Sequence, residues 1–383
     1  MTVAACPVCG DPGSVVITDT GEVPVFCNQL CKTKADAVGA AKAIIRLSFC
    51  TSCGHVYNSL FDPSLVKYSP EYENSLHFSQ RFQDYANALA LELTHRYALR
   101  GKRIVEIGCG RGDFLASLCR HGRNIGFGFD MSYPPDEAPA TASISISGTA
   151  YGIEHRGIDP DLVCTRHVLE HVAAPTEFLR SIRETMRDGT PLYVEVPNVR
   201  YILRDGGVWD LIYEHCGYFS ASSLQTALQL AGFRVTLIRR AFEDQFLAAH
   251  AVADRPSGVA RPEPELVSST EEFAAEHGLK LAQWRTSLEE LSVAERRVVA
   301  WGAGSKGNTF ANLVAGNERV PYLVDINPRK HGMFVAGTGA RIVPPEFLRE
   351  YRPDVVVVLN PSYQAEIRAR LDELGISAEL RVA

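Results

Sequence analysis

The stretch that most restricts the fold is RIVEIGCGRGDFL, residues 103–115. Its apolar first half is typical of a buried strand, and it leads through three closely spaced glycines into a predicted helix. Glycine at such a turn lets the backbone bend sharply and approach a ligand closely. We therefore predict a strand–turn–helix unit of an α/β fold, with a ligand at the turn.

Short apolar runs and helical stretches alternate around this unit, which predicts a largely parallel sheet. The strands predicted from Lys102 to about Ala253 are RIVEIG, NIGFGFD, DLVCTRH, PLYVEVP and RVTLIRR. A second block contains RVVAWGAG, VPYLVD and DVVVVLN. Between the blocks, the polar and proline-rich residues 253–270 predict a linker and residues 271–291 a helix. Residues 69–99 predict a helical connection into the first block.

Composition excludes several classes of protein. The chain has 383 residues, enough for two or three domains. A net charge of -6 argues against a nucleic-acid-binding surface. No apolar run approaches the length of a membrane span, and the N-terminus has no signal-peptide pattern, so we expect a cytoplasmic protein. Ten cysteines in such a protein indicate metal binding or free thiols rather than disulfides.

Two C-x-x-C-G pairs lie in the first 60 residues, CPVCG and CTSCG. Their four thiols predict a tetrahedral, structural zinc site, because four thiolates leave no position for water. The predicted ligands are Cys6, Cys9, Cys50 and Cys53. Cys27 and Cys31 have a looser spacing without the glycine, and we predict that they do not bind the metal.

The charges around the first glycine-rich turn favour a cationic ligand. Glu106 lies inside the strand and Asp113 follows the last glycine, where a phosphate would be repelled. S-adenosylmethionine, whose amino-acid end carries an ammonium group, is therefore favoured over a dinucleotide, which remains the alternative. Asp130 ends the next strand, where a carboxylate binds ribose hydroxyls; a helix or turn cap is its other interpretation. The predicted cofactor-binding residues are Glu106, Gly108, Gly110, Gly112, Asp113, Asp130 and His167.

At these residues the chain resembles class I methyltransferases. EIGCGRGDFL is similar to their first motif, and DLVCTRHVLEHVAAP is similar to their fourth strand with the L-E-H stretch that follows it. Glu170 and His171 of that stretch, with His167, have the spacing of one helical turn. We expect packing or substrate-edge roles for them rather than a metal site.

YEHCGYFS, residues 213–220, places an acid beside an imidazole. The two interpretations are a catalytic base with a neighbouring carboxylate and the polar start or cap of a helix. The residues alone do not separate them. Neighbours in a helix do not face each other, so Glu214 could contact the substrate rather than orient His215.

The order of the motifs favours the catalytic interpretation. A paired-cysteine module, a methyltransferase core, an E-H motif and a Rossmann-like C-terminal domain together resemble the sugar C-methyltransferases. That resemblance implies methylation at carbon 3 of a nucleotide-linked 4-keto-deoxysugar, with His215 as the base. The implied catalytic set is His215, Glu214, Tyr213 and Tyr72, and Tyr68 and Tyr218 would bind the sugar. The stretch from Val25 to Ser48 looks longer than we expect for this family.

A second glycine-rich turn, GAGSKG, follows the strand RVVAW. Taken alone it indicates a nicotinamide dinucleotide site. Lys306 inside the turn suits a phosphate. In the family resembled, this domain holds the nucleotide diphosphate of the sugar and no redox cofactor. The predicted substrate-binding residues here are Gly304, Ser305, Lys306, Asn308, Asp325 and Asn360.

We therefore expect three domains: a zinc module over residues 1–75, a class I methyltransferase domain over 76–255, and a linker helix with a Rossmann-like nucleotide-binding domain over 256–383. The expected function is C-methylation of a nucleotide-linked keto sugar, in a monomer or homodimer without nucleic-acid or membrane partners. The alternatives are an O-methyltransferase of a sugar or small natural product, an NAD-dependent sugar oxidoreductase, and a zinc-bearing scaffold without activity.

Overall fold

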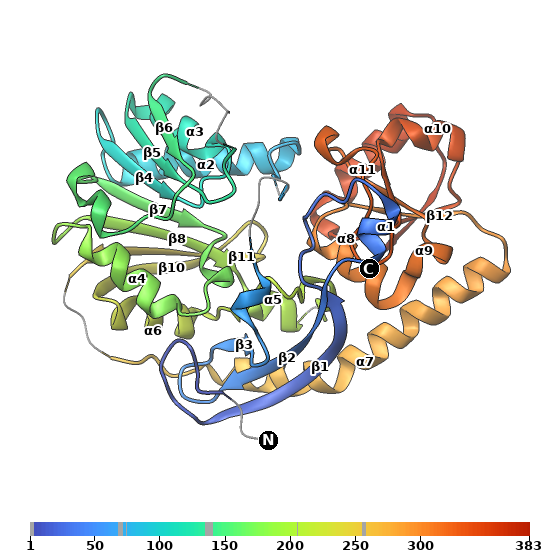
Figure 1. The fold of residues 1–383 in the computed structure, drawn as a ribbon, viewed down its shortest axis with the longest axis horizontal. Helices are drawn as coiled ribbons and strands as arrows, with labels where there is room; N and C mark the ends of the chain where they lie inside the picture. Colours follow the sequence, from blue (N-terminus) through green and yellow to red (C-terminus); the bar gives the residue numbers. More distant parts are fainter. Residues whose placement is uncertain (1–3, 68–71, 74, 135–140, 205, 255–257) are drawn as a thin grey trace.

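The structure is a computed structural model that describes all residues except 1–3, 68–71, 74, 135–140, 205 and 255–257. Within the described residues the chain forms three sheets, of four, seven and five strands. The seven- and five-stranded sheets form two lobes, and the N-terminal strands lie below and between them (Figure 1). The predicted α/β class and its parallel sheets are confirmed.

The four-stranded sheet is antiparallel, in the order β1-β2-β3-β9. Its strands are β1 (Ser14–Pro24), β2 (Lys42–Cys50), β3 (Val56–Asn58) and β9 (Gly217–Tyr218), and the helical segments near it are α1 (Lys34–Val38) and η1 (Pro63–Leu65). Strand β9 comes from the YEHCGYFS segment, and its Tyr218 pairs with Val56. The N-terminal module therefore holds the backbone immediately after His215, although that segment belongs to the predicted 76–255 domain.

The seven-stranded sheet has the order β10-β11-β8-β7-β4-β5-β6. The five strands from β8 to β6 are parallel, and β11 is antiparallel to both of its neighbours. Its strands are β4 (Arg103–Ile107), β5 (Ile125–Phe129), β6 (Ile144–Ser147), β7 (Leu162–Arg166), β8 (Pro191–Pro197), β10 (Phe233–Ala241) and β11 (Phe246–Ala253). Its helical segments are α2 (Gln80–Arg96), α3 (Asp113–Gly122), η2 (Ile153–Ile158), η3 (Leu169–His171), α4 (Pro175–Glu184), α5 (Val199–Arg204), η4 (Val208–Asp210) and α6 (Ala221–Leu230).

The five-stranded sheet is fully parallel, in the order β14-β13-β12-β15-β16. Its strands are β12 (Val298–Trp301), β13 (Tyr322–Val324), β14 (Arg341–Val343), β15 (Val355–Val358) and β16 (Glu379–Val382). The accompanying helical segments are α7 (Pro264–Val293), α8 (Ser305–Phe310), the π-helical η5 (Ala311–Ala315), α9 (Gly316–Arg319), η6 (Pro328–Lys330), η7 (Pro345–Phe347), α10 (Leu348–Tyr351), η8 (Pro361–Tyr363) and α11 (Gln364–Glu373).

Two predicted boundaries are wrong. The long helix α7 begins at Pro264, inside the predicted linker, because proline is well suited to the first turn of a helix. Leu266 in the first turn and Phe273 in the third are buried in the core. The predicted helix over 69–99 is shorter: α2 begins at Gln80, capped by the Ser79 hydroxyl, and the described residues before it are not helical. The eight predicted strands are all present. The described strands that were not predicted are β6, β11, β14 and β16 of the two larger sheets and all four strands of the N-terminal sheet, β1, β2, β3 and β9.

A single apolar core joins the N-terminal sheet to the C-terminal lobe. It includes Leu47 of β2, Trp209 of η4 and Phe310 of α8, with the Trp209 and Phe310 ring centroids 4.9 Å apart. Helix α7 contributes Leu288 to the same core and runs beneath both lobes (Figure 1). The segment that carries His215 is thus packed against the module before it and the domain after it. Among the described helices, none has the length and apolarity that a bilayer-spanning segment requires.

Candidate active site

A cleft of about 1020 Å³ lies between the seven-stranded and five-stranded sheets, at the carboxyl ends of their parallel strands. Ligand sites of open α/β sheets occur at this edge, because the loops that follow the strands converge there. Most of the predicted site residues line it: Tyr72, Glu106, Gly108, Gly110, Asp113, Asp130, His167, His215, Gly304, Ser305, Lys306, Asp325 and Asn360.

Five predicted residues do not line the cleft: Gly112, Tyr213, Glu214, Tyr218 and Asn308. The last four are buried to 1 % exposure or less, so they could reach a ligand only through another residue. A sixth, Tyr68, lies outside the described residues.

The first glycine-rich turn needs glycine at two positions. Gly108 has φ of +72°, and a Cβ there would lie 2.0 Å from the Val168 side chain. Gly112 has φ of +82° and precedes α3, and a Cβ there would lie 2.7 Å from Ile146. Any side chain would therefore strain the turn and fill the space beside it. This cradle fits a ligand that meets the backbone closely, as predicted for S-adenosylmethionine.

Asp130 closes the same turn. Its Oδ2 accepts the Gly110 N–H at 2.7 Å, and its Oδ1 accepts the backbone N–H of Ser132 at 2.9 Å and its hydroxyl at 2.6 Å. Asp130 thus has the capping role that was its alternative interpretation. Carboxylate oxygens have two acceptor positions each, so bonds to a ribose remain compatible with these contacts.

A buried charge network lies behind the turn. Glu195 is within 3.0 Å of Arg166 and 3.2 Å of His167 Nε2, and Arg166 lies 4.1 Å from the ring centroid of Phe114. The carboxylates beside His167 raise its pKa to about 9 despite the opposing effect of burial. Burial raises the pKa of Glu106 to about 8. Position 167 has φ of +55°, a conformation that a non-glycine residue rarely adopts.

The second glycine-rich turn is closed in the same way as the first. Asp325 Oδ2 accepts the Ala303 N–H at 2.9 Å and Oδ1 accepts the Asn327 N–H at 2.8 Å. The sequence of this turn contains a lysine and no acidic residue. In the structure, however, Lys306 forms an ion pair with Asp210 of η4. Only the tertiary structure brings Asp210 and Asp325 to a turn whose own sequence contains no acid.

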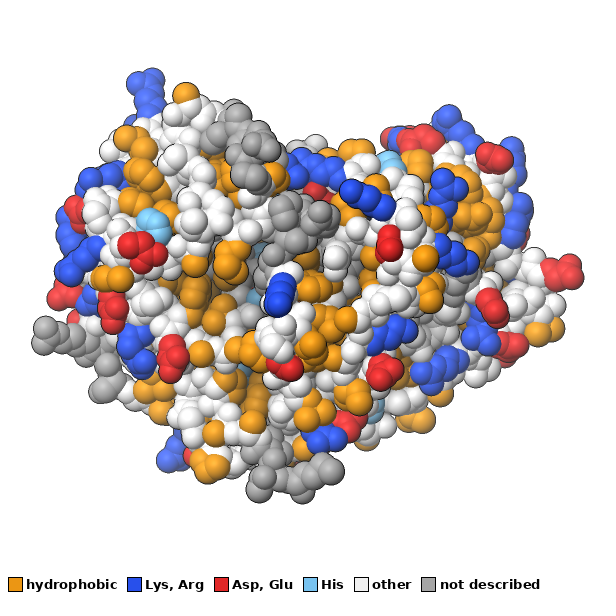
Figure 2. Space-filling model, in the orientation of Figure 1, with side chains coloured by type: hydrophobic (Ala, Val, Ile, Leu, Met, Phe, Trp, Pro, Cys, Tyr) orange, Lys and Arg blue, Asp and Glu red, His pale blue; other side chains and the backbone are white. Residues whose placement is uncertain are grey.

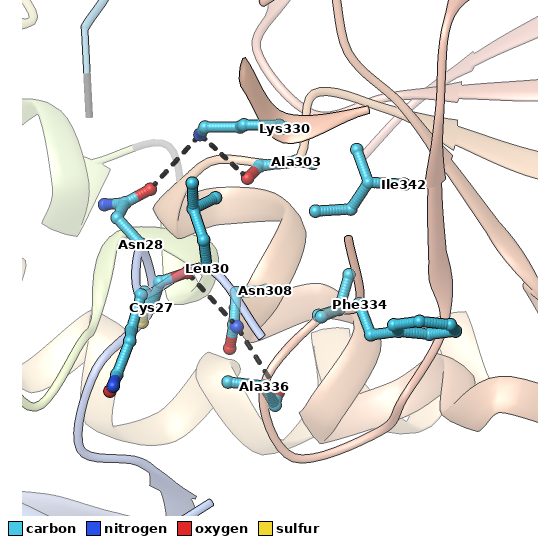
Figure 3. A pocket seen from close by; sticks show the side chains of 11 residues that line it. Cys27, Asn28, Leu30, Ala303, Asn308, Lys330, Phe334, Ala336 and Ile342 are labelled. Carbon is cyan, nitrogen blue, oxygen red and sulfur yellow. Dashed lines mark hydrogen bonds between the residues drawn. The ribbon is translucent and has the colours of Figure 1, made fainter. Parts of the chain in front are cut away.

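Residues that the motifs did not indicate complete this wall of the cleft. The Lys330 ammonium, 5 % exposed, donates to Ala303 O at 3.0 Å and lies 3.4 Å from Asn28 Oδ1 (Figure 3). Asn308, predicted to bind substrate, instead donates to Cys27 O and Ala336 O, both at 3.3 Å (Figure 3). Asn308 therefore joins the N-terminal segment to the C-terminal lobe. Asn360 does line the cleft, and its amide also donates to Gln245 Oε1 at 3.0 Å.

His215 lies in a turn between η4 and β9, partly exposed to the cleft. It does not cap a helix: α6 is capped by Ser220, whose hydroxyl accepts the Ser223 N–H. Its ring meets that of His171 edge-on, with centroids 4.7 Å apart. Burial, together with the charges of His171, His167 and Lys306, lowers the pKa of His215 well below the ordinary histidine value.

Glu214, although next in sequence, is directed away from His215. It is fully buried and accepts the Tyr72 hydroxyl at 2.6 Å and the Cys27 N–H at 2.5 Å. It therefore orients Tyr72, which does line the cleft, rather than the imidazole. The adjacency of the two residues did not predict this, because neighbouring side chains point in different directions.

Tyr213 and Tyr218 belong to the core. The Tyr213 oxygen accepts the Asp62 N–H at 2.8 Å, and the Tyr218 hydroxyl bonds to the backbone of Ile212 at 3.1 Å. Both are 1 % exposed. The structure therefore does not place either phenol where the predicted catalytic or sugar-binding role would require it.

The four cysteines of the two C-x-x-C-G pairs come together. The Sγ atoms of Cys6 and Cys53 are 3.7 Å apart, those of Cys9 and Cys50 are 3.6 Å apart, and all four lie within 4.8 Å of one another. Four thiol sulfurs so close together suit a tetrahedral metal ion. Cys31 belongs elsewhere, in a small cluster with Ala37 and Ala336. That the ion is zinc remains a prediction.

Comparisons with known proteins agree with this geometry. The family described as a methyltransferase domain matches residues 78–238, and the family described as a C-methyltransferase C-terminal domain matches residues 264–377. The chain contains a methyltransferase domain followed by a C-methyltransferase C-terminal domain. The methyltransferase domain carries the first glycine-rich turn and His215, and the C-methyltransferase C-terminal domain carries the second turn.

Curated relatives include enzymes of two acceptor types. The C-methyltransferase NovU of Streptomyces niveus is 25 % identical over 225 residues, which are 54 % of this chain and 52 % of that protein. A ubiquinone biosynthesis O-methyltransferase of Aeromonas salmonicida is 30 % identical over 113 residues, 26 % of this chain and 45 % of that protein. The chain thus spans about half the length of the curated relatives it matches.

Solved structures similar to parts of this chain include two methyltransferases. One is a Burkholderia thailandensis 1,6-didemethyltoxoflavin-N1-methyltransferase with bound S-adenosylhomocysteine, at 17 % identity and a TM-score of 0.36 over 46 % of this chain and 81 % of that one. Another is the magnesium protoporphyrin IX methyltransferase of Synechocystis PCC 6803, at 15 % identity and a TM-score of 0.36. That match covers 45 % of this chain and 84 % of that one. Our interpretation of the site rests on its own geometry and not on these two likenesses.

Proposed function

We propose that the protein is an S-adenosylmethionine-dependent C-methyltransferase that methylates a carbon next to a ketone. The acceptor that we propose is a nucleotide-linked keto sugar, methylated at C3 of a 4-keto-deoxysugar. The observation that carries the proposal is that one cleft is lined by both glycine-rich turns and by a half-buried histidine of depressed pKa. The match to a C-methyltransferase C-terminal domain supports methylation at carbon.

The cofactor would bind at the first turn. The close backbone approach at Gly108 and the carboxylates of Asp113 and Asp130 suit a ligand with an ammonium group and a ribose. When bound, S-adenosylmethionine supplies an electrophilic methyl group on a sulfonium. The residues of the turn need only bind and orient it beside the acceptor carbon.

His215 would act as the general base. Carbon becomes a nucleophile only after a proton next to the ketone is removed, and imidazole suits that step near neutral pH. The lowered pKa of His215 keeps the ring neutral and able to accept a proton. Tyr72, oriented by Glu214, presents its phenol to the same cleft and would assist at a sugar oxygen.

The sugar nucleotide would bind at the second turn. Gly304 and Ser305 begin α8 there, Lys306 follows in the same turn, and the Lys330 ammonium donates to Ala303 O beside it. Backbone N–H groups at a helix start and nearby lysines suit a diphosphate. The cofactor and the sugar would then reach His215 from opposite walls of the cleft.

An O-methyltransferase remains the second candidate, because ubiquinone biosynthesis O-methyltransferases are among the relatives. An NAD-dependent sugar oxidoreductase is disfavoured, because the second turn lies within a region that matches a C-methyltransferase domain. A scaffold without activity would give no turnover with any acceptor.

A deuterium-exchange assay separates these functions. The protein is incubated in D₂O with nucleoside-diphosphate-linked 4-keto-deoxyhexoses, with S-adenosylhomocysteine or S-adenosylmethionine, and products are followed by NMR and mass spectrometry. We expect exchange at the carbon next to the ketone and a new C–CH₃ group when S-adenosylmethionine is present. His215→Ala should bind both ligands but lose turnover by about 10²-fold or more. The matched control is His121→Ala, at an exposed position of α3.

An O-methyl product formed without exchange would establish the second candidate. Binding of NAD at the second turn, with sugar oxidation, would contradict the proposal. Wild-type turnover in His215→Ala would remove His215 from the mechanism while leaving the reaction class in place.

A further inference from the structure

One buried carboxylate at the cleft has no role in the proposal above. Glu170 lies in η3, immediately after β7, and is 1 % exposed. Both of its carboxylate oxygens are buried without a hydrogen-bond partner among the described residues. Its Oε1 lies 3.5 Å from His167 Nδ1, and a buried carboxylate without hydrogen bonds is costly, so a further donor is expected in the working enzyme.

A complementary group lies beside it. The Nδ1 atom of His215 is also buried and without a hydrogen-bond partner in the described part of the chain. Ligating atoms of Glu170, His171 and His215 all lie within 4.8 Å of one another. A carboxylate only accepts hydrogen bonds, and a neutral imidazole can donate one from Nδ1. The unpaired acceptor and the unpaired ring nitrogen therefore complement each other.

The backbone fixes this arrangement on both sides. The Cys216 thiol donates to the Glu170 carbonyl at 3.4 Å, and the Asn58 N–H donates to the Cys216 carbonyl at 3.0 Å. The segment that carries His215 is thus held between η3 and the N-terminal sheet. Glu214 is not available for the same role, because Tyr72 and Cys27 occupy its oxygens.

We propose that Glu170 is the positioning residue of the His215 base. Its carboxylate would accept the Nδ1–H of His215, which fixes the tautomer with Nε2 as the free basic nitrogen. Ligating atoms of the two residues lie within 4.8 Å of each other, and catalytic hydrogen bonds are often long before ligands bind, so the contact would tighten in the complex. This inference deepens the proposed function and rests on it.

The charges in the reaction balance with Glu170 in this role. The C–H bond next to the ketone breaks, its proton moves to His215 Nε2, and its electron pair forms the enolate. The enolate carbon then bonds to the methyl group as the sulfonium–methyl bond breaks, leaving a neutral thioether. His215 ends as an imidazolium, and the Glu170 carboxylate offsets that positive charge in a site that is largely closed to water.

The surrounding charges make this carboxylate necessary. Arg166 and His167 face Glu195, and His167 Nδ1 also lies 3.5 Å from Glu170. His171 and Lys306 disfavour a charge on His215, and Glu214 is committed to Tyr72. Without Glu170, a protonated His215 would add positive charge to a group that already contains several cations.

The test compares Glu170→Gln, which keeps the shape and removes the charge, with Glu170→Asp, which keeps the charge. The matched control is Glu177→Gln, the same change at an exposed position of α4. We expect Glu170→Gln to lower kcat and the deuterium-exchange rate together by about 10²-fold or more, as loss of a carboxylate behind a catalytic histidine does. KM and S-adenosylhomocysteine affinity should stay within about twofold. Glu170→Asp should recover part of the rate, and Glu177→Gln should behave as wild type.

Several outcomes would overturn the inference. Wild-type exchange in Glu170→Gln would show that His215 works without this carboxylate. Loss of S-adenosylhomocysteine binding in parallel with activity, in both Glu170 variants, would indicate a structural role. Stimulation of the wild type by added Mg²⁺ or Mn²⁺, absent in Glu170→Gln, would reassign the cluster to a metal site. Failure of the proposed function is distinct, because the wild type would then show no exchange at carbon.

Discussion

Lys306 of the second glycine-rich turn is ion-paired with Asp210, five residues before His215. The two side chains are 18 % and 23 % exposed, and the Lys306 ammonium also lies 5.9 Å from the ring centroid of Tyr201. A diphosphate bound at this turn, as proposed, would have to share or replace Asp210.

Replacement of either partner should change substrate affinity and leave cofactor affinity alone. Lys306→Ala removes a charge-assisted contact worth ~1.5–3 kcal/mol, so we expect KM for the nucleotide sugar to rise about tenfold to a hundredfold. Asp210→Asn frees the lysine, and KM should fall by about threefold, since partly exposed pairs are weak. Steady-state kinetics and calorimetry with S-adenosylhomocysteine measure both effects. Weaker cofactor binding in Lys306→Ala would show that the two turns do not divide the ligands as proposed.

The N-terminal cysteine cluster should hold one zinc ion per chain. Cys50→Ser removes one of four thiolates, so metal analysis of the purified variant should show loss of zinc. The Cys31→Ser variant is the matched control, because Cys31 lies outside the cluster and should leave the zinc in place. Because the N-terminal sheet holds β9, Cys50→Ser should also lower thermal stability. Zinc retained in Cys50→Ser, or lost in Cys31→Ser, would refute the assignment.

Asp130 caps the first turn and is predicted to bind ribose as well, and a pair of ligands can distinguish the two roles. Asp130→Ala removes the bond to the Gly110 N–H and, if the carboxylate binds ribose, the bonds to its hydroxyls. We expect weaker binding of S-adenosylhomocysteine by ~1.5–3 kcal/mol for each charge-assisted bond lost. Calorimetry should be repeated with the 2′-deoxy analogue. A smaller loss for the analogue supports ribose binding, and equal losses would leave Asp130 with the turn alone.

The pH dependence of the reaction follows from the lowered pKa of His215. A general base works when unprotonated, so kcat/KM should fall on the acid side only below the ordinary histidine pKa of about 6.5. The lowering of the His215 pKa comes from burial first, and then from the charges of His171, His167 and Lys306. In Glu170→Gln the pH at which kcat/KM falls should be lower still. A fall of kcat/KM in the wild type above pH 6.5 would contradict a lowered pKa of His215.

The sequence by itself determined the features that depend on local backbone geometry. The glycines at 108 and 112 are required by positive φ and close packing. The strand before the first turn is apolar apart from Arg103 and Glu106, and the strand before the second turn is apolar throughout. The C-x-x-C-G spacing likewise brings the two sulfurs of each pair together through local backbone geometry. The fold class, the two turns and the four-cysteine cluster could all be inferred for that reason.

The tertiary structure alone decided which side chains meet. Glu214 is adjacent to His215 in sequence but binds Tyr72, whereas Glu170, 45 positions earlier, lies beside His215. Tyr213 and Tyr218 look like substrate ligands in the motif, yet their rings fill the core. Contacts of this kind depend on strand pairing and side-chain direction over long sequence separations. A linear motif therefore pointed to the candidate segment, and the packing of three sheets around it determined which of its residues face the cleft.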